Sequence, residues 1–342
     1  MISILRKLLK KPLREAEFWV KSQIATLLRW VFLRINPPIT VTLDSSLSVD
    51  GTGAQLQRQA AIIAFAQYFG FGYVRSDIKQ VSVHPLDPFQ SPTEYREYLV
   101  RLNKFLKFKS KIDFNQNSQE ISVPSLSFSR LICECLSQIV RPTPHHFLIF
   151  EPYSVTEFCP GIMDALNLQS NEKIPTSVTE KVFAIVIHYR QGVGGFALYP
   201  GQNIPREIPI ETFVKRVSSV VRELPDDLDW QIFVLTDAPE SETSFIPPLG
   251  QVSLWEGTPG FSNGVMTISP TSFNALEKYS KLPLRVIRGG NPLDAILIMA
   301  SADILFTGKS SLSFLGGLLN EKGQVFYPRD FWHRPPQNWN AL

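Results

Sequence analysis

Cysteine is scarce in this sequence: its 342 residues contain only Cys133, Cys135 and Cys159. Three cysteines cannot form a disulfide framework, and their spacing does not fit a structural zinc site. The sequence also lacks any Asn-x-Ser/Thr glycosylation site. Both absences fit a reducing compartment, so a cytoplasmic protein is predicted. No uninterrupted run of 18 apolar residues occurs, which excludes a conventional transmembrane span.

Charged residues make up only 19% of the chain, against 44% hydrophobic residues that include 24 Phe and 6 Trp. This composition excludes a disordered or fibrous chain, and the length suits two α/β domains of roughly 150 residues each. The net charge of +3 is uneven, because residues 1–36 hold eight Lys/Arg and two Glu while the remainder sums to −3. A body this close to neutral argues against nucleic acid as a partner.

Residues 1–38 form a basic segment with the apolar spacing of an amphipathic helix. Lysines and arginines fall mostly off the apolar stripe, and Trp19 and Trp30 are the rings that favour a lipid headgroup boundary. Such a helix is predicted to lie on an anionic membrane surface, which would make the protein peripheral on the inner face of a membrane. The alternative is a helix that packs back on the protein. Pro12 is expected to kink or split the helix, and Pro37-Pro38 to end it. The stripe consists of Ile2, Leu5, Leu9, Leu13, Ala16, Val20, Ile24, Leu27, Val31 and Ile35.

Residues 39–175 are predicted to form the first α/β domain, which the resemblance described below places on the acceptor side. A β-branched strand, a Gly-containing loop, an apolar helix and a second strand begin it. Residues 80–130 are expected to be a loop-rich insertion with a helix at 94–108, and residues 169–179 a polar link. The predicted elements are strands at 39–43, 71–74 and 146–150 and helices at 55–68 and 129–139.

Residues 176–342 are predicted to form a second, Rossmann-like domain. The continuous apolar run at 181–189 is typical of a strand buried on both faces of a parallel sheet. Asn291-Pro292 marks a helix start, with an N-cap Asn, Pro at the first helical position and Asp294 in the first turn. The other expected elements are a helix at 210–224, strands at 231–237 and 285–288, a strand beginning near 303 and a closing helix.

Polar residues gather where these predicted strands end, which is where open parallel sheets bind ligands. His188 and Arg190 follow one strand, Asp237 another, and Ser310, Ser311 and Ser313 open the closing helix. Arginine offers a permanently protonated fork, and a helix N-terminus offers unpaired N–H groups, so together they predict a nucleotide-diphosphate site. Each has a plainer alternative: a structural histidine, a surface ion pair, a turn acid and capping serines.

Several sharper motifs are incomplete. Gly308-Lys309-Ser310 resembles the end of a P-loop, but Asp303 stands where the first Gly is required. After Gly51-Thr52-Gly53, Leu56 replaces the third small residue of a dinucleotide fingerprint, which disfavours a nicotinamide-dependent oxidoreductase. Asp227 and Asp229 precede a strand rather than following one and are interpreted as a solvated turn. No metal site or cofactor is predicted.

Four segments together resemble the fucosyltransferase-like superfamily of GT-B glycosyltransferases, which contains α1,2-, α1,6- and protein O-fucosyltransferases. Gly51-TGAQLQRQAAIIAFAQYFG resembles its first loop and helix, and His188-Tyr-Arg-Gln-Gly its His-x-Arg-x-Gly motif. Phe233-VLTDAPE resembles the strand with a terminal acid, and Asp294-AILIMASADILFTGKSSLSFLGGLLN the closing motif. The resemblance covers residues 45–330 and implies two Rossmann-like domains facing a central cleft.

The resemblance also implies roles. Arg190 would neutralise the pyrophosphate and His188 would contact the nucleotide, in an inverting, metal-independent sugar transfer, by family default from GDP-fucose. The implied acceptor is a glycan or lipid-linked molecule in surface polysaccharide synthesis. The implied donor-binding residues are Asp237, Ser310, Ser311, Ser313 and Gly192, and the implied acceptor-side residues are Gly51, Gly53, Gln55 and Arg58.

The loop after Arg190 departs from the family, because Gln191-Gly192 is followed by Val193-Gly194-Gly195 where relatives carry an acidic or hydroxyl residue. This departure motivates a second hypothesis, a catalytically inactive nucleotide-sugar-binding or scaffolding protein of the same fold. The general base is left open among Asp77, His84 and Glu151.

Overall fold

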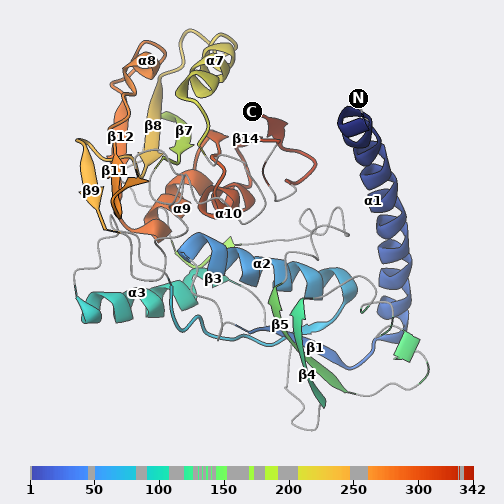
Figure 1. The fold of residues 1–342 in the computed structure, drawn as a ribbon. Coiled ribbons are helices and arrows are strands. Elements are labelled where there is room, and N and C mark those ends of the chain that lie inside the picture. The colour runs from blue at the N-terminus through green and yellow to red at the C-terminus, as the bar shows by residue number, and fades with distance from the viewer. Residues whose placement is uncertain are drawn as a thin grey trace.

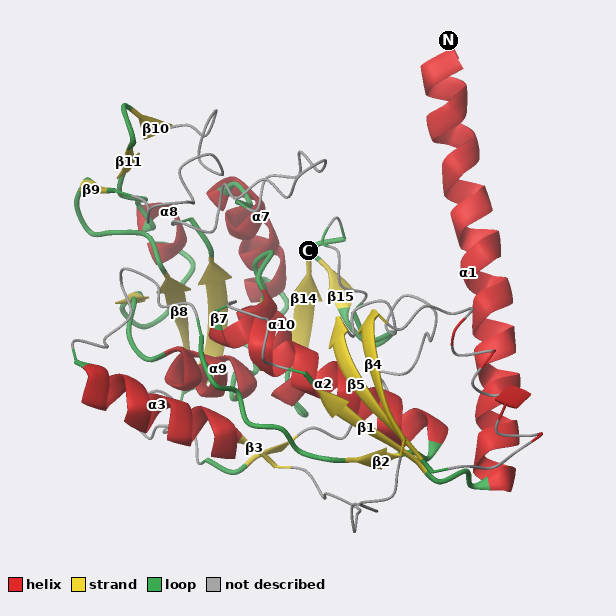
Figure 2. Cartoon of the chain, turned by 60° about the horizontal axis from the view of Figure 1, so that its bottom comes forward, coloured by secondary structure: helices red, strands yellow, loops and turns green. Residues whose placement is uncertain are grey.

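The computed structural model describes residues 2–44, 51–81, 91–107, 119–125, 130, 133, 136–137, 140, 144–151, 169–172, 182–191, 207–246, 261–329, 331 and 335–342. These residues form two larger parallel sheets with helices packed around them (Figure 1, Figure 2). The predicted α/β class is confirmed. The division into domains at residue 175 and the cleft between the domains remain predictions.

The smaller parallel sheet has the strand order β2-β1-β5-β4. Its strand β4 was not predicted, because it falls in the loop-rich insertion expected at residues 80–130. That prediction is wrong for residues 119–125. Pro124 lies inside β4, which is tolerated because β4 is an edge strand of the described sheet. The elements are β1 (Ile39–Leu43), α2 (Thr52–Phe69), β2 (Gly72–Tyr73), β4 (Gln119–Ser125) and β5 (His145–Glu151). The helix predicted at 129–139 falls mostly outside the described residues.

The larger sheet has the order β12-β8-β7-β13-β14-β15, and every neighbouring pair is parallel. Numbered from β7 along the chain, its first five strands are ordered 3-2-1-4-5, as in a Rossmann-like sheet. The order therefore reverses between β7 and β13. The strands are β7 (Phe183–Tyr189), β8 (Trp230–Thr236), β12 (Arg285–Arg288), β13 (Ile304–Phe306), β14 (Gln324–Tyr327) and β15 (Asn340–Ala341).

The helices predicted at 210–224, after Asn291 and at the closing motif join these strands, whereas α8 (Asn274–Glu277) was not predicted. Asn291 is the N-cap of α9, its side chain accepts a hydrogen bond from Leu293 N, and Pro292 follows it. A small antiparallel sheet of β9, β11 and β10 was not predicted, because strands of two to four residues are too short to show an alternating pattern. The helices are α7 (Ile210–Val221), α8 (Asn274–Glu277), α9 (Pro292–Ala300) and α10 (Ser311–Leu319); the strands are β9 (Thr243–Phe245), β10 (Phe261–Ser262) and β11 (Val265–Ile268).

Helix α3 (Pro92–Phe105) begins with a capping box, in which Ser91 and Glu94 satisfy each other's backbone N–H groups. The helix leads into β3 (Leu106–Lys107), which pairs antiparallel with β6 (Gln169–Ser170). The stretch at 169–179 that was predicted as a polar link therefore begins with strand β6. Because β6 pairs with β3, which directly follows α3, this stretch lies beside the end of α3.

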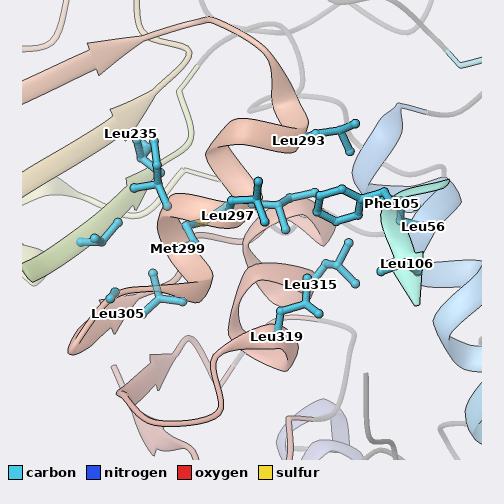
Figure 3. Close-up of a cluster of buried hydrophobic side chains, with 14 of the residues drawn as sticks. Leu56, Phe105, Leu106, Leu235, Leu293, Leu297, Met299, Leu305, Leu315 and Leu319 are labelled. Atoms are coloured by element: carbon cyan, nitrogen blue, oxygen red, sulfur yellow. The ribbon is translucent and has the colours of Figure 1, made fainter. Parts of the chain in front are cut away.

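One hydrophobic core takes residues from both halves of the chain. Leu56 of α2 and Phe105 and Leu106 from the end of α3 pack with side chains of α9 and α10 (Figure 3). Leu293, Leu297 and Leu315 are three of these partners, and each is at most 2% exposed. Apolar packing therefore joins α2 and α3 of the first half to α9 and α10 of the second.

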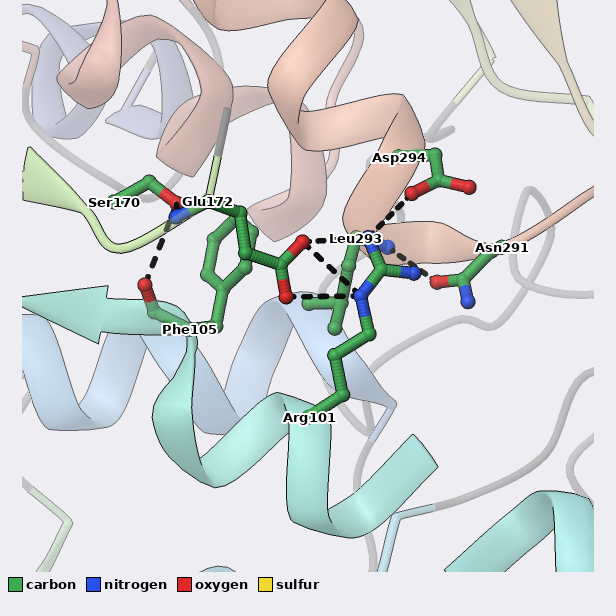
Figure 4. A network of polar contacts seen from close by, with 7 residues as sticks. All are labelled: Arg101, Phe105, Ser170, Glu172, Asn291, Leu293 and Asp294. Atoms are coloured by element: carbon green, nitrogen blue, oxygen red, sulfur yellow. Dashed lines mark hydrogen bonds and ion pairs between the residues drawn. The ribbon is translucent and has the colours of Figure 1, made fainter. Parts of the chain in front are cut away.

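Polar contacts cross beside this core. The Arg101 guanidinium of α3 makes three hydrogen bonds to Glu172, from Nε to Oε1 at 2.9 Å, from Nε to Oε2 at 3.0 Å and from Nη2 to Oε2 at 2.6 Å. Its Nη2 also donates to Asp294 of α9 (Figure 4). These charge-assisted bonds hold the pKa of Arg101 above its usual range. Arg101 therefore links α3 to the first turn of α9.

Helix α1 (Ile2–Ile35) is continuous, so Pro12 does not split it, and the alternative that Pro12 kinks it stays a prediction. It ends as predicted before Pro37 and Pro38. Ala25, Leu28 and Phe32 are buried in the core beside the smaller sheet. The alternative that the helix packs back on the protein therefore holds for its last turns. None of the helices described is both long and apolar enough to cross a bilayer.

Candidate functional site

The end of β7 delivers two of the predicted site residues. His188 lies in the strand and is 5% exposed, and Arg190 is the first residue after the strand ends at Tyr189. The His188 Nδ1 atom is buried and has no hydrogen-bond partner among the described residues. Burial, aided by the nearby Arg190 charge and opposed by Asp237, lowers the pKa of His188 from 6.5 to about 4. The imidazole is therefore neutral at pH 7.

The pKa of His188 gives a testable pH dependence of stability. Between pH 6.5 and 4 the unfolded chain binds a proton at this position that the folded chain does not, so stability should fall as the pH falls through this window. At pH 5, His188 should lower the free energy of unfolding by on the order of 2 kcal/mol relative to neutral pH. We expect His188→Gln to remove this part of the dependence. Urea unfolding of both proteins at a series of pH values measures it, and equal slopes would contradict the assignment.

Arg190 lies against Asp237, which follows β8. Arg190 Nη1 is 3.1 Å from Asp237 Oδ2, with the two side chains 23% and 10% exposed. The backbone N–H of Gln191 donates to Asp237 Oδ1 at 2.8 Å. Both carboxylate oxygens thus contact the segment after β7. Asp237 fixes the position of Arg190, and its predicted contact with a base or ribose remains a prediction.

Gln191 connects this corner to the loop between β11 and α8. Its side-chain Nε2 donates to Ser269 O at 3.0 Å, and Thr271 Oγ1 donates to its Oε1. Sequence reasoning noted Gln191 only as part of a departure from the family motif. The feature that could have identified Gln191 is its side-chain amide, which can donate one hydrogen bond and accept another at the same time. Gly192 lies outside the described residues.

The end of β13 and the start of α10 form the opposite side of the strand-order reversal. A Cβ on Gly308 would lie 2.7 Å from His188 O and 3.2 Å from His188 Nδ1, so only glycine allows this approach. Ser310 is the N-cap of α10, and its Oγ accepts from Leu312 N at 3.2 Å. The loop after β13 is thus pressed against β7. The positive end of the α10 dipole begins there.

The three predicted serines have different surroundings. Ser313 is fully buried, and its Oγ donates to Gly308 O and Ser310 O, both at 3.1 Å. Its hydroxyl holds the loop in shape. Ser310 and Ser311 are half-buried at the helix start. Lys309, which was considered only within an incomplete P-loop, is 6% exposed in the same loop.

The predicted acceptor-side loop meets the same helix. Gly51 is the N-cap of α2, and a Cβ on Gly53 would lie 2.5 Å from Leu312 N. The N-terminal turns of α2 and α10 therefore touch, and their positive dipole ends adjoin. Gln55 and Arg58 are buried at 0% and 6% exposure. The first and second halves of the chain thus converge at the start of α10.

The candidate general bases are less well defined. Asp77 forms an ion pair with Arg75 at 3.4 Å, with the Asp77 side chain 71% exposed. Glu151 is the last residue of β5, and His84 lies outside the described residues. Asp227 lies in an exposed turn, as predicted, and Asp229 beside it pairs with Lys281 at 3.6 Å. The described part of the chain contains no group of three or more His, Cys, Asp or Glu side chains that could hold a metal ion.

Comparisons with known proteins return only distant likenesses. No protein-family model and no curated protein matches the chain. Among solved structures, POFUT1 in complex with GDP is similar at 11% identity and a TM-score of 0.40, over 89% of this chain and 98% of that one. The Escherichia coli ADP-heptose lipopolysaccharide heptosyltransferase II is similar at 10% identity and a TM-score of 0.35, over 89% of both chains. E. coli heptosyltransferase WaaC with ADP-2-deoxy-2-fluoro heptose is similar at 10% identity and a TM-score of 0.33, over 89% of this chain and 92% of that one.

Proposed function

We propose that this chain is a glycosyltransferase that takes its sugar from a nucleotide diphosphate bound between the carboxyl ends of β7 and β13. One observation carries the proposal: the strand order reverses between these two strands, and Arg190 and the start of α10 flank the reversal. Ligands of open parallel sheets bind at such a point. A guanidinium and a helix N-terminus supply the positive field that a diphosphate requires.

In the proposed reaction an acceptor hydroxyl attacks the anomeric carbon while the bond from that carbon to the diphosphate oxygen breaks. The new C–O bond forms on the opposite face, so the configuration inverts. The leaving diphosphate gains negative charge, which Arg190 and the N–H groups of α10 stabilise without a metal. His188, which is neutral at pH 7, contacts the nucleotide without adding charge to the site. The acceptor proton passes to a base from the first half of the chain.

We assign GDP-fucose as the default donor from the resemblance of the His188-Tyr-Arg and closing motifs. The acceptor would approach over the N-terminal turn of α2, because Gly53 places that turn against α10. A glycan or lipid-linked acceptor in surface polysaccharide synthesis, on the cytoplasmic side of a membrane, fits this arrangement. The donor-binding set then comprises Arg190, His188, Ser310 and Ser311, with Asp237 and Ser313 holding them in place.

A second function, nucleotide-sugar binding without transfer, is favoured by the contacts of the segment after β7. Arg190 is ion-paired with Asp237, and the side chain of Gln191 is bonded to the loop before α8. With these contacts in place, the segment can bind a diphosphate only if the Arg190 guanidinium contacts the diphosphate while it stays paired with Asp237. Turnover separates the two functions.

A panel of ligands tests both functions. We expect GDP to raise the unfolding temperature of the full chain, since a ligand at about 100 times its Kd adds about 2.7 kcal/mol to stability. UDP and ADP serve as matched nucleotides, and donor hydrolysis or transfer is then measured with the corresponding sugars. Binding with turnover supports the enzyme, and binding without turnover supports the second function. If no nucleoside diphosphate stabilises the chain, the site assignment is wrong.

A further inference from the structure

Helix α1 exposes an unusual concentration of large apolar side chains. Trp19 is 63% exposed, Leu27 60%, Trp30 55% and Leu33 52%. Trp19 and Trp30 are eleven residues apart, which is three helical turns, so they lie in line along the helix. Leu27 and Leu33 flank this line within about a quarter turn on either side. We call these four residues the outer face of α1.

The opposite face of α1 is fixed to the protein. Ala25 and Phe32 are 0% and 1% exposed, and the Phe32 ring lies 4.8 Å from the Phe71 ring and 77° from its plane. Arg29 Nε donates to Tyr68 O at 3.0 Å, and its guanidinium lies 4.9 Å above the Tyr68 ring. The helix therefore presents the outer face away from the core without undocking. Figure 1 and Figure 2 both show α1 at one edge of the protein, with its N-terminus away from the smaller sheet.

Charge identifies the occupant of the outer face. Residues 1–36 carry eight Lys/Arg and two Glu, so an anionic surface is attracted and a second copy of the same basic helix is repelled. Tryptophan rings favour the headgroup boundary, and Arg34 lies 4.4 Å above the Trp30 ring, where a cation and an aromatic ring meet an anionic headgroup together. Because Ala25, Leu28 and Phe32 stay packed on the protein, the outer face meets a membrane with the helix lying in the membrane plane.

We propose that the outer face of α1 inserts into the headgroup region of an anionic membrane while Ala25, Leu28 and Phe32 keep the helix docked on the protein. The structure thereby changes the sequence-based prediction. Ile24 and Val31 of the predicted stripe pack against the core, and the two tryptophans with Leu27 and Leu33 form the lipid-binding surface. The protein would bind the membrane at a fixed orientation.

Flotation of the full-length chain with phosphatidylcholine vesicles, with and without phosphatidylglycerol, tests this inference. We expect binding only to vesicles that contain phosphatidylglycerol, and weaker binding as salt rises. The variant Trp19→Gln/Leu27→Gln/Trp30→Gln should lose at least roughly tenfold in partitioning. The matched control, Val100→Gln/Ile246→Gln, removes apolar residues that are 54% and 77% exposed away from α1 and should bind like the parent.

Bromine-labelled lipids add a readout that a merely structural effect would not produce. Trp19→Phe/Trp30→Phe keeps the outer face apolar, so it should still bind but lose the quenching of tryptophan fluorescence. Circular dichroism and thermal unfolding confirm that each variant is folded. The inference is overturned if the parent does not bind, if the triple variant binds as well as the parent, or if the parent is a dimer that the triple variant converts to a monomer.

Discussion

Replacing Arg190 with alanine should lower kcat/KM for sugar transfer by roughly two to three orders of magnitude, the usual cost of removing a preorganised group that stabilises charge in the transition state. Arg190 is a charged side chain beside the reversal of strand order, and its guanidinium Nη1 lies 3.1 Å from Asp237 Oδ2. Initial rates with the donor that the nucleotide panel identifies measure the effect. Thermal unfolding, measured in parallel, separates loss of the fold from loss of the charge.

Two companion variants make this experiment decisive. Arg190→Ala leaves the carboxylate of Asp237 nearly buried and without its cation, so Arg190→Ala/Asp237→Asn should recover stability without recovering activity. Arg285→Ala removes an exposed arginine at the amino end of β12, far along the strand from the site, and should leave kcat/KM unchanged. A rate for Arg190→Ala close to that of the parent would exclude the phosphate role.

The second half of the chain was the more predictable part of the fold. Residues Phe183 to Ile187 of β7 are all apolar because both faces of the strand are covered, and the helix after Asn291 carries its own start signal. Strand β4 was missed because Gln119 and Glu120 open it and Pro124 interrupts it, features that in isolation indicate a loop. Its pairing with β5 supplies the stability that its own sequence does not show.

For the candidate site, the order of the parallel strands predicts which residues lie near one another, but it does not predict which side-chain atoms make contact. Parallel strands end at the same edge of a sheet, so the sequence alone predicts that the residues after 189 and 236 lie close together. Which oxygen of Asp237 meets Arg190, and that Ser313 turns inward to Gly308 and Ser310, depend on packing between distant segments. No local pattern encodes such contacts.

The contact between α2 and α10 predicts that replacing Gly53 with alanine destabilises the protein, although the same change normally stabilises a helix. Gly53 is in the first turn of α2, where alanine should be favoured over glycine by about 1 kcal/mol on helix propensity alone. A Cβ at this position would instead lie 2.5 Å from Leu312 N and 2.7 Å from Leu312 Cα, both of which are backbone atoms. We therefore expect Gly53→Ala to lower the free energy of unfolding by about 1–3 kcal/mol, because the helices must move apart. Urea unfolding measures this change.

Gly51→Ala is the matched control for Gly53→Ala. Gly51 lies two residues earlier, is the N-cap of the same helix and has open space where its Cβ would lie, so alanine there should cost less than about 1 kcal/mol. The same displacement should also weaken GDP binding in Gly53→Ala and not in Gly51→Ala, because α10 carries the N–H groups proposed to hold the diphosphate. If Gly53→Ala is instead more stable than the parent, helix propensity alone governs the position. In that case α2 does not press on α10, and the acceptor-side loop does not reach the donor site in the way proposed.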